Sequence, residues 1–317
     1  MRDGERTIRF AEGSAAEAPD LLGRHGFSDY TLLTTPRAAG SAPLEPAATL
    51  EVPPGFVDQI SAALLPDAGE RPLVALGGGR VVDTAKAIGG ATGAPVAAIP
   101  TTLSGAELTP FHRTPAGVEG ARLVRPSLVI ADPLLMASQR EPQLWASAAN
   151  ALAHGMEALY TPLANPVAEA AALRGARAIF DEELALGAVL CGWASGLTGF
   201  AVHHATCQLL VRTAGSPHAQ TNAVMLPHFA GLMSSRVPAE LGEFARALGD
   251  PGGNPEAAAG RAAKLAARSG HTRLATLGVE EEHLPPVVDA VMRHPALANT
   301  PDPPDEEELL RLLRDAL

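Results

Sequence analysis

The chain has 317 residues, of which 46% are hydrophobic, 19% charged and only 4% aromatic. This balance excludes a disordered, collagen-like or membrane-embedded chain and leaves a globular protein. A chain of this length buries a large core, and we expect two domains rather than one. The formal net charge of −11 opposes binding to nucleic acid, whose phosphates are neutralised by Lys and Arg.

The first ten residues, MRDGERTIRF, carry both charges and lack the apolar core of a signal peptide. No uncharged run reaches the roughly 18 residues that a membrane-spanning helix needs. The two cysteines, Cys191 and Cys207, are too few for a disulfide framework or a CxxC site. We therefore expect a cytoplasmic protein that acts on a small molecule, with no membrane or nucleic-acid partner.

The first 130 residues alternate short apolar runs with helical or loop stretches. The runs typical of strands are 30–34, 48–52, 73–76, 94–99 and 128–130. This alternation indicates an α/β domain with a parallel sheet, which we place at residues 1–137.

From about Ser138 the pattern changes to long segments rich in Ala and Leu, interrupted by Pro and Gly. They are 146–159, 166–179, 182–210, 255–269 and 305–317. We expect residues 138–317 to form an all-helical domain. Asp305 followed by Glu308 resembles a capping box that opens the last helix, and the nearby acidic residues suit a helix N-terminus.

Three consecutive glycines, Gly77, Gly78 and Gly79, directly follow the apolar run 73–76. Glycines at a strand-to-helix turn let backbone N–H groups approach a ligand, and the helix dipole favours an anion there. The run thus predicts a pyrophosphate site. A tight turn that needs positive φ angles explains the glycines equally well, and Asp83 and Lys86 are also spaced to pair with each other.

A second polar run, 99–109, leaves another strand at its carboxyl end. It carries Thr101, Thr102, Ser104 and Glu107. Ligands of open α/β sheets bind at this edge, so we expect the run to face the same ligand. The alternative is a loop whose hydroxyls cap the next helix.

Asn150 and His154 lie four residues apart and share one helix face, with Glu157 one turn further. One buried histidine is most often a core residue, but several in apolar sequence favour a site. A divalent ion remains possible, although a neutral amide is a weaker ligand than a carboxylate. The other histidines of this half that stand out are His203, His204 and His218.

Six motifs occur in the order and rough spacing of the iron-containing alcohol dehydrogenase family, which has the dehydroquinate-synthase-like fold. They are GGGRVVDTAKAI, IPTTLSGAELTP, ADP, NALAHGMEALYTPLANP, HHATCQLL and SPHAQTNAVMLPH, and they cover most of residues 74–228. Within that family the chain most resembles the maleylacetate reductase branch. The resemblance implies a Rossmann-like dinucleotide domain, a helical domain and a cleft between them for NAD(P)H and substrate.

The resemblance also implies roles for individual residues. Those at cofactor-binding positions are Gly77, Gly78, Gly79, Asp83, Thr101, Thr102 and Ser104. Those at the metal-ligand positions of iron-dependent members are Asn150, His154, His204 and His218. His203, next to His204, must point about 100° away around the helix, so we expect it to orient its neighbour or to pack in the core.

The chain departs from the family pattern at several points. Asn150 replaces an Asp, which in the maleylacetate reductase branch accompanies catalysis without a metal. Gln208 replaces a His, and Arg80 replaces the usual Ser beside the glycine turn. The segment 34–36 lacks the acidic residue that binds a ribose 2′-OH, so the choice between NADH and NADPH stays open.

The chain is also short for this family. Only about a dozen residues separate the strands at 30 and 48, fewer than a βα crossover normally takes. A second helix is shortened near residues 180–182. The first gap falls where the adenosine end of the cofactor would be supported, which leaves dinucleotide binding open.

The sequence therefore predicts a homodimeric, metal-independent NAD(P)H-dependent reductase of a small carbonyl or enoyl-type carboxylate. His154, His204 or His218 would orient the acceptor and donate a proton. A non-redox lyase, dehydratase or cyclase that uses the same histidines is an alternative. A degenerate scaffold or partner subunit is a third, because fold alone does not fix function.

Overall fold

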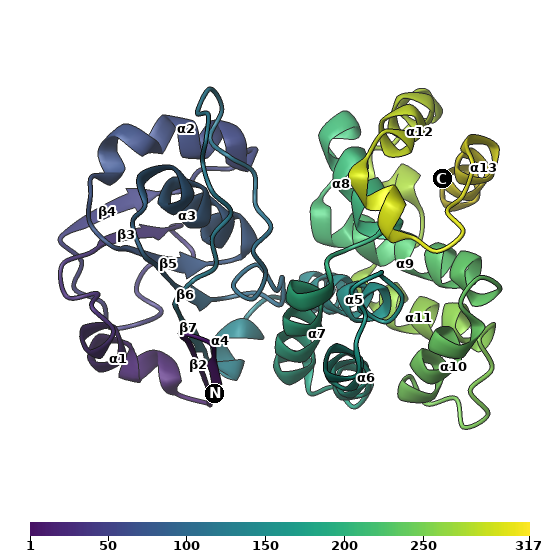
Figure 1. Ribbon diagram of the computed structural model, residues 1–317, viewed down its shortest axis with the longest axis horizontal. Helices are drawn as coiled ribbons and strands as arrows, with labels where there is room; N and C mark the ends of the chain where they lie inside the picture. The colour runs from purple at the N-terminus through teal and green to yellow at the C-terminus, as the bar shows by residue number, and fades with distance from the viewer. The chain divides into compact units, whose positions relative to one another are not determined.

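The computed structural model describes all residues, 1–317, and the chain forms two compact units, Met1–Gln139 and Arg140–Leu317 (Figure 1). The boundary expected from the sequence lies two residues earlier, between 137 and 138.

The first unit contains a seven-stranded sheet in the order β1-β2-β7-β6-β5-β3-β4, in which every pair except β1 and β2 is parallel. The predicted α/β class is confirmed, and so are all five predicted strands. The strands are β1 Arg2–Asp3, β2 Arg6–Phe10, β3 Thr31–Thr34, β4 Ala48–Glu51, β5 Leu73–Gly77, β6 Val96–Pro100 and β7 Leu128–Ala131. Strands β1 and β2 lie in the charged N-terminal segment, where no strand was predicted.

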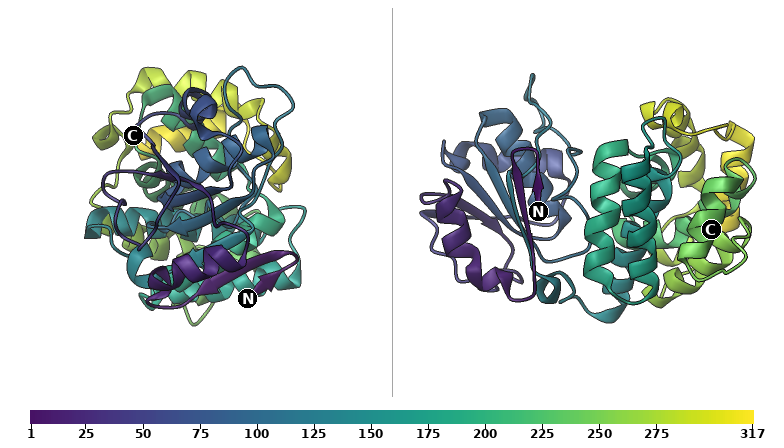
Figure 2. Two further views of the ribbon diagram at one scale, coloured as in Figure 1. Left: turned by 90° about the vertical axis from the view of Figure 1, so that its left-hand side faces the viewer. Right: turned by 60° about the horizontal axis from the view of Figure 1, so that its bottom comes forward.

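The three middle strands, β5, β6 and β7, are apolar at every position because both faces of the sheet are covered. Leu32 and Val74 pack with the residues of α1 (Ala18–Arg24) on one face. Leu33 and Ala75 pack with α2 (Val57–Ala68) and α3 (Gly79–Thr92) on the other. Figures 1 and 2 show α1 and the pair α2 and α3 on opposite sides of the sheet. The remaining elements of this unit are the short helices η1 Ser14–Glu17 and α4 Pro133–Met136.

The parallel neighbours β3 and β4 are joined by residues 35–47 without a helix. Parallel strands usually need a helical crossover, so this connection is unusually short. It consists of tight turns, in which the Ala38 amide donates to the Thr35 carbonyl (3.0 Å) and the Ser41 hydroxyl to the Ala38 carbonyl (2.6 Å). As the sequence predicted, the connection between β3 and β4 contains no crossover helix.

The second unit is all-helical, as predicted. Its α-helices are α5 Glu141–Ala158, α6 Pro166–Phe180, α7 Leu184–Thr198, α8 Val202–Ala214, α9 His218–Ser234, α10 Pro238–Ala247, α11 Ala257–Ala266, α12 Leu284–Met292 and α13 Glu306–Ala316, joined in places by short 3₁₀ turns. The segment 182–210 forms two helices, because Gly199 adopts a φ of 84° and ends α7. Asp305 caps α13 by accepting a hydrogen bond from the Glu308 amide (2.8 Å).

Helix α5 lies at the centre of this unit and packs against α6, α7 and α9 (Figure 1). The contact with α6 and α7 is close because glycines surround Cys191: a Cβ at Gly155 or Gly175 would lie 2.7 or 2.6 Å from the Cys191 sulfur. Burial raises the pKa of Cys191 to about 12, so this thiol fills space and is not a nucleophile. The packing holds α5 in place, and α5 carries Asn150 and His154.

Taken singly, none of the helices has both the length and the apolar composition needed to cross a membrane. Only α7 and α8 together meet that test, and they are bent by 101° at the break between them.

Candidate functional site

The three glycines form the turn between β5 and α3, but none of them has a positive φ angle. The positive-φ explanation is therefore wrong. A Cβ on Gly78 would lie 2.9 Å from the Thr102 side chain, and one on Gly79 would lie 2.9 Å from the Ser104 hydroxyl. Glycine is required here because the loop that follows β6 approaches the turn closely.

That loop runs alongside the start of α3 and supplies polar groups to it. The Thr101 amide donates to the Gly77 carbonyl (3.0 Å), which fixes the loop to the end of β5. The Thr102 hydroxyl is buried without a hydrogen-bond partner. The first N–H groups of any helix lack partners within the helix and bind anions well. These groups fit a diphosphate, and their role in cofactor binding remains a prediction.

Asp83 and Lys86 pair along α3, with 2.8 Å between the carboxylate and the ammonium. Lys86 is fully buried, while the Asp83 side chain is 28% exposed. The pairing that the spacing allowed is thus present. A direct contact of Asp83 with the cofactor is untested.

Glu107, in the same loop, is fully buried, and no other residue donates a hydrogen bond to its carboxylate. Burial raises the pKa of Glu107 to about 7, although Lys86 and Arg6 favour its ionised form. Its backbone carbonyl accepts a hydrogen bond from Arg6 (2.9 Å). The loop therefore carries a carboxyl group that changes its charge near neutral pH.

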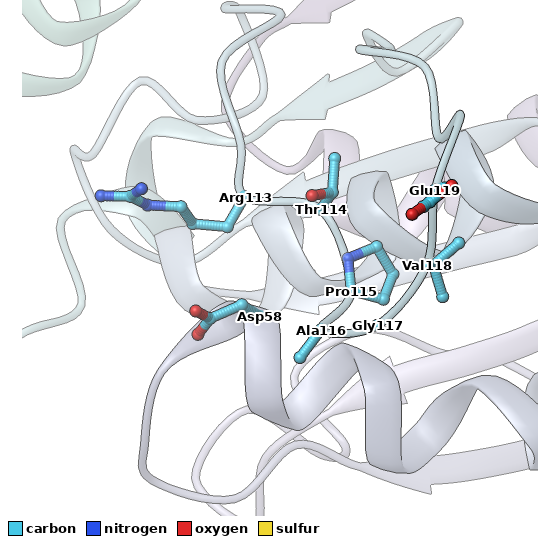
Figure 3. Close-up of a pocket in the computed structure, with 8 residues that line it drawn as sticks. All are labelled: Asp58, Arg113, Thr114, Pro115, Ala116, Gly117, Val118 and Glu119. Carbon is cyan, nitrogen blue, oxygen red and sulfur yellow. The ribbon is translucent and has the colours of Figure 1, made fainter.

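The surface of this unit also has a cavity of about 360 Å³, away from the glycine turn in sequence (Figure 3). It is lined by Asp58 of α2 and by residues 113–119, and the Ala116 amide donates to the Asp58 carbonyl (2.9 Å). None of the predicted site residues lines it.

In the second unit, α5 and α8 bring His154 and His204 together. Their rings stack with centroids 3.9 Å apart and planes inclined by 18°. The Ser195 hydroxyl of α7 lies 3.2 Å from Nδ1 of His154. His154 is half-buried, whereas His204 is only 2% exposed.

A buried carboxylate, Glu157, holds the start of α8. Its Oε1 accepts hydrogen bonds from the amides of His203 (2.8 Å) and His204 (3.3 Å), and its Oε2 lies 2.5 Å from Nδ1 of His204. Burial raises the pKa of Glu157. Since Nδ1 of His204 faces this carboxylate, Nε2 is the nitrogen left for a ligand, and it is buried with no hydrogen-bond partner.

Burial also keeps the two adjacent histidines neutral at pH 7. It lowers the pKa of both His203 and His204 to about 3, with smaller contributions from neighbouring imidazoles. The His203 ring packs edge-on against Phe229 at 5.3 Å, and its Nε2 lies 3.8 Å from the Cys207 sulfur. His203 thus occupies the hydrophobic interior, one of the two positions expected for it.

His218 and Asn150 complete the set. His218 is exposed at the first position of α9, and Asn222 donates to its backbone carbonyl (2.9 Å). Asn150 is 2% exposed and lies one turn before His154 on α5. His218 is close enough to His204 to lower its pKa.

These residues fit a catalytic metal poorly. His154 and His204 are stacked nearly face to face, while metal ligands must direct their lone pairs to one point. The one group whose ligand atoms all lie within 4.8 Å is Glu157, His203 and His204. Both Glu157 oxygens are already used by hydrogen bonds, and Asn150 offers only a neutral amide.

The sequence patterns assigned no role to Ser195 and Asn222, and they marked Glu157 and Lys86 only by their spacing from His154 and Asp83. Glu157 lies in the otherwise apolar stretch 151–160 and three residues after His154, which is a usable signal for a buried, functional carboxylate. The contact of Ser195 with His154 comes from the packing of α7 on α5 and leaves no local pattern, whereas Asn222 contacts His218 within α9 at the spacing i, i+4.

Comparisons with known proteins agree with these features. Residues 9–109 match the model for "Iron-containing alcohol dehydrogenase", and residues 145–317 match the model for "Fe-containing alcohol dehydrogenase family, C-terminal". The maleylacetate reductase of Rhizobium sp. (strain MTP-10005) is 32% identical over 98% of this chain and 95% of its own. That alignment spans 345 positions, more than the 317 residues of this chain, so the relative contains insertions.

Solved structures give the same result. The crystal structure of maleylacetate reductase from Agrobacterium tumefaciens is 31% identical, covers 98% of this chain and 96% of its own, and has a TM-score of 0.84. Sulfoacetaldehyde reductase from Bifidobacterium kashiwanohense, in complex with NAD⁺, shares the fold at 23% identity, with a TM-score of 0.81 over 100% and 98% of the two chains. The chain belongs to the iron-containing alcohol dehydrogenase family, and it is an NAD(P)-dependent oxidoreductase.

The raised pKa of Glu107 predicts how stability depends on pH. The folded-state pKa of about 7 lies above the ordinary value of 4.5, so this group's contribution to stability is full below pH 4.5 and is lost as the pH rises to 7. Glutamine cannot ionise, so the variant Glu107→Gln should not lose this stability. The free energy of unfolding of the variant minus that of the unmodified chain should therefore be about 3 kcal/mol larger at about pH 8 than at about pH 4. Urea denaturation at both values checks this, and an equal difference at both would contradict it.

Proposed function

We propose that this chain reduces a small carbonyl or enoyl-type carboxylate with NAD(P)H, without a metal ion, as a cytoplasmic homodimer. Full-length relatives that are named maleylacetate reductases support this substrate class. The single observation that carries the metal-independent proposal is Asn150, a neutral amide at the position of the family's carboxylate ligand. The poor fit of the stacked histidines to a metal supports it as well.

The cofactor, when bound, supplies the hydride. In the first unit, the turn at residues 77–79 and the loop with Thr101, Thr102 and Ser104 would hold its diphosphate through N–H and hydroxyl groups. Arg80, exposed in the first turn of α3, would add a positive charge beside that diphosphate. The missing helix between β3 and β4 weakens support for the adenosine end, so affinity would rest on the diphosphate contacts.

In the second unit, different histidines would orient the acceptor and donate the proton. Neutral His204, fixed by Glu157, presents the unprotonated Nε2, which would orient the acceptor by accepting a hydrogen bond from one of its hydroxyl or carboxyl groups. The acceptor gains a hydride at carbon and needs one proton, which a more exposed imidazole, His154 or His218, would donate. Solvent then returns that proton to the imidazole.

The decisive experiment is a titration of the purified protein with NADH and NADPH, followed by nicotinamide fluorescence. Saturable binding of either one, followed by consumption of that cofactor with maleylacetate as substrate, is the expected result. If neither nucleotide binds, the reductase proposal fails, and the non-redox use of the same histidines becomes the function to test.

Metal analysis provides a separate prediction. We expect no stoichiometric iron or zinc in protein expressed in metal-supplemented medium, because the four positions offer three imidazoles and a neutral amide without a carboxylate. We expect Asn150→Asp to bind added Zn²⁺ at least about tenfold more tightly than the unmodified chain. One equivalent of metal that survives gel filtration in the unmodified protein would refute metal independence.

Alanine substitutions test the roles of the histidines. Losing a general acid or base costs about 10²–10⁴-fold in turnover, while losing a supporting contact costs about 10–100-fold. We therefore expect the larger loss for Ala at His154, His204 or His218, and the smaller loss at His203. Circular dichroism of each variant controls for folding. Full activity in all three of the first group would refute the site.

A further inference from the structure

The chain uses lysine at only two positions, Lys86 and Lys264, although Lys and Arg together number 24. Lys264 is exposed on α11, as a charged side chain normally is. Lys86 is 0% exposed in α3, and burial lowers its pKa. Burying an ammonium group costs several kcal/mol unless all its hydrogens find acceptors, so this lysine needs an explanation.

All three hydrogens of the Lys86 ammonium find acceptors. Nζ lies 2.8 Å from Oδ1 of Asp83, 2.8 Å from the Ala106 carbonyl and 2.7 Å from the Phe111 carbonyl. Such distances are typical of charge-assisted hydrogen bonds. A compact ammonium offers three donors from one atom, whereas the planar guanidinium of the arginines used elsewhere would not fit the same three acceptors.

Two of these acceptors belong to the loop that faces the glycine turn. The loop is tied to the turn at its start by the hydrogen bond from the Thr101 amide to the Gly77 carbonyl (3.0 Å). Thr102 and Ser104 then lie against the glycines. The segment that follows, 106–111, is bonded through its carbonyls to Lys86. Lys86 thus fastens the loop to α3 beyond the residues predicted to bind diphosphate.

We propose that Lys86 is a positioning residue for the cofactor, which holds the loop 101–111 closed over the glycine turn so that Thr102 and Ser104 meet the diphosphate. This inference rests on the proposed cofactor site and deepens it. Lys86 itself is enclosed by protein and makes no contact with the ligand. Its effect is on cofactor affinity, and the hydride-transfer step does not use it.

The main test compares Lys86→Met with the matched control Lys264→Met, each in the full-length protein. Methionine keeps the length of the side chain and removes the donors. We expect Lys86→Met to raise the Kd and KM for the nicotinamide cofactor about 10–100-fold, with kcat at saturating cofactor within about threefold. Lys264→Met should leave both unchanged. Equal KM values in Lys86→Met and the unmodified enzyme would overturn the proposal.

A second measurement covers the case in which Lys86→Met does not fold. Acetylation of the unmodified protein by an amine-reactive reagent, read by mass spectrometry, compares the two lysines in one molecule. If the loop must open to expose Lys86, cofactor should slow acetylation of Lys86 at least about tenfold and leave Lys264 unaffected. No change at Lys86 at saturating cofactor would overturn the proposal.

The two hypotheses fail in different ways. If the unmodified protein binds neither NADH nor NADPH, the proposed function fails, and the role of Lys86 fails with it. If the unmodified protein binds cofactor but Lys86→Met binds it equally well, only the positioning role fails.

Discussion

The hydrogen bonds of the Glu157 carboxylate hold both the start of α8 and the ring of His204 in the helical unit. Gly199 ends α7, and α8 begins three residues later inside the protein, where its first N–H groups have no water to bond. Glu157, from α5, accepts hydrogen bonds from two of these N–H groups and also contacts Nδ1 of His204. The group that satisfies the buried helix end therefore fixes the ring orientation of the histidine at the centre of the site.

In the first unit, the glycine turn and the loop 101–111 depend on each other in a similar way. The glycines at 77–79 have ordinary φ angles, and what they provide is space for Thr102 and Ser104. Hydrogen bonds hold the loop against the turn on both sides of Thr102 and Ser104. The Thr101 amide makes one of them before these residues, and Lys86 makes another after them. A ligand that approaches the turn closely would therefore also contact the loop, whose position is fixed by these hydrogen bonds.

Local patterns predicted the parts of the fold that depend on local rules. The buried strands β5, β6 and β7 are apolar throughout and could be located, whereas β2 contains two arginines beside a second charged strand and resembles a surface segment. The i, i+3 spacing of Asp83 and Lys86 predicted their pairing, but the two carbonyls that Lys86 also binds come from a loop 20 and 25 residues away. Likewise, the stacking of His154 on His204 depends on how α5 and α8 cross, which no spacing within either helix encodes.

The charge balance of the histidine cluster gives a physical reason for Asn150. Glu157 is already a buried carboxylate, and its cost is offset by two amides and an imidazole. A second buried carboxylate at position 150, which is 2% exposed, would need a cation to compensate it. A bound metal ion would serve that purpose. A neutral amide has the same shape and avoids the penalty, which supports the proposal that this chain works without a metal ion.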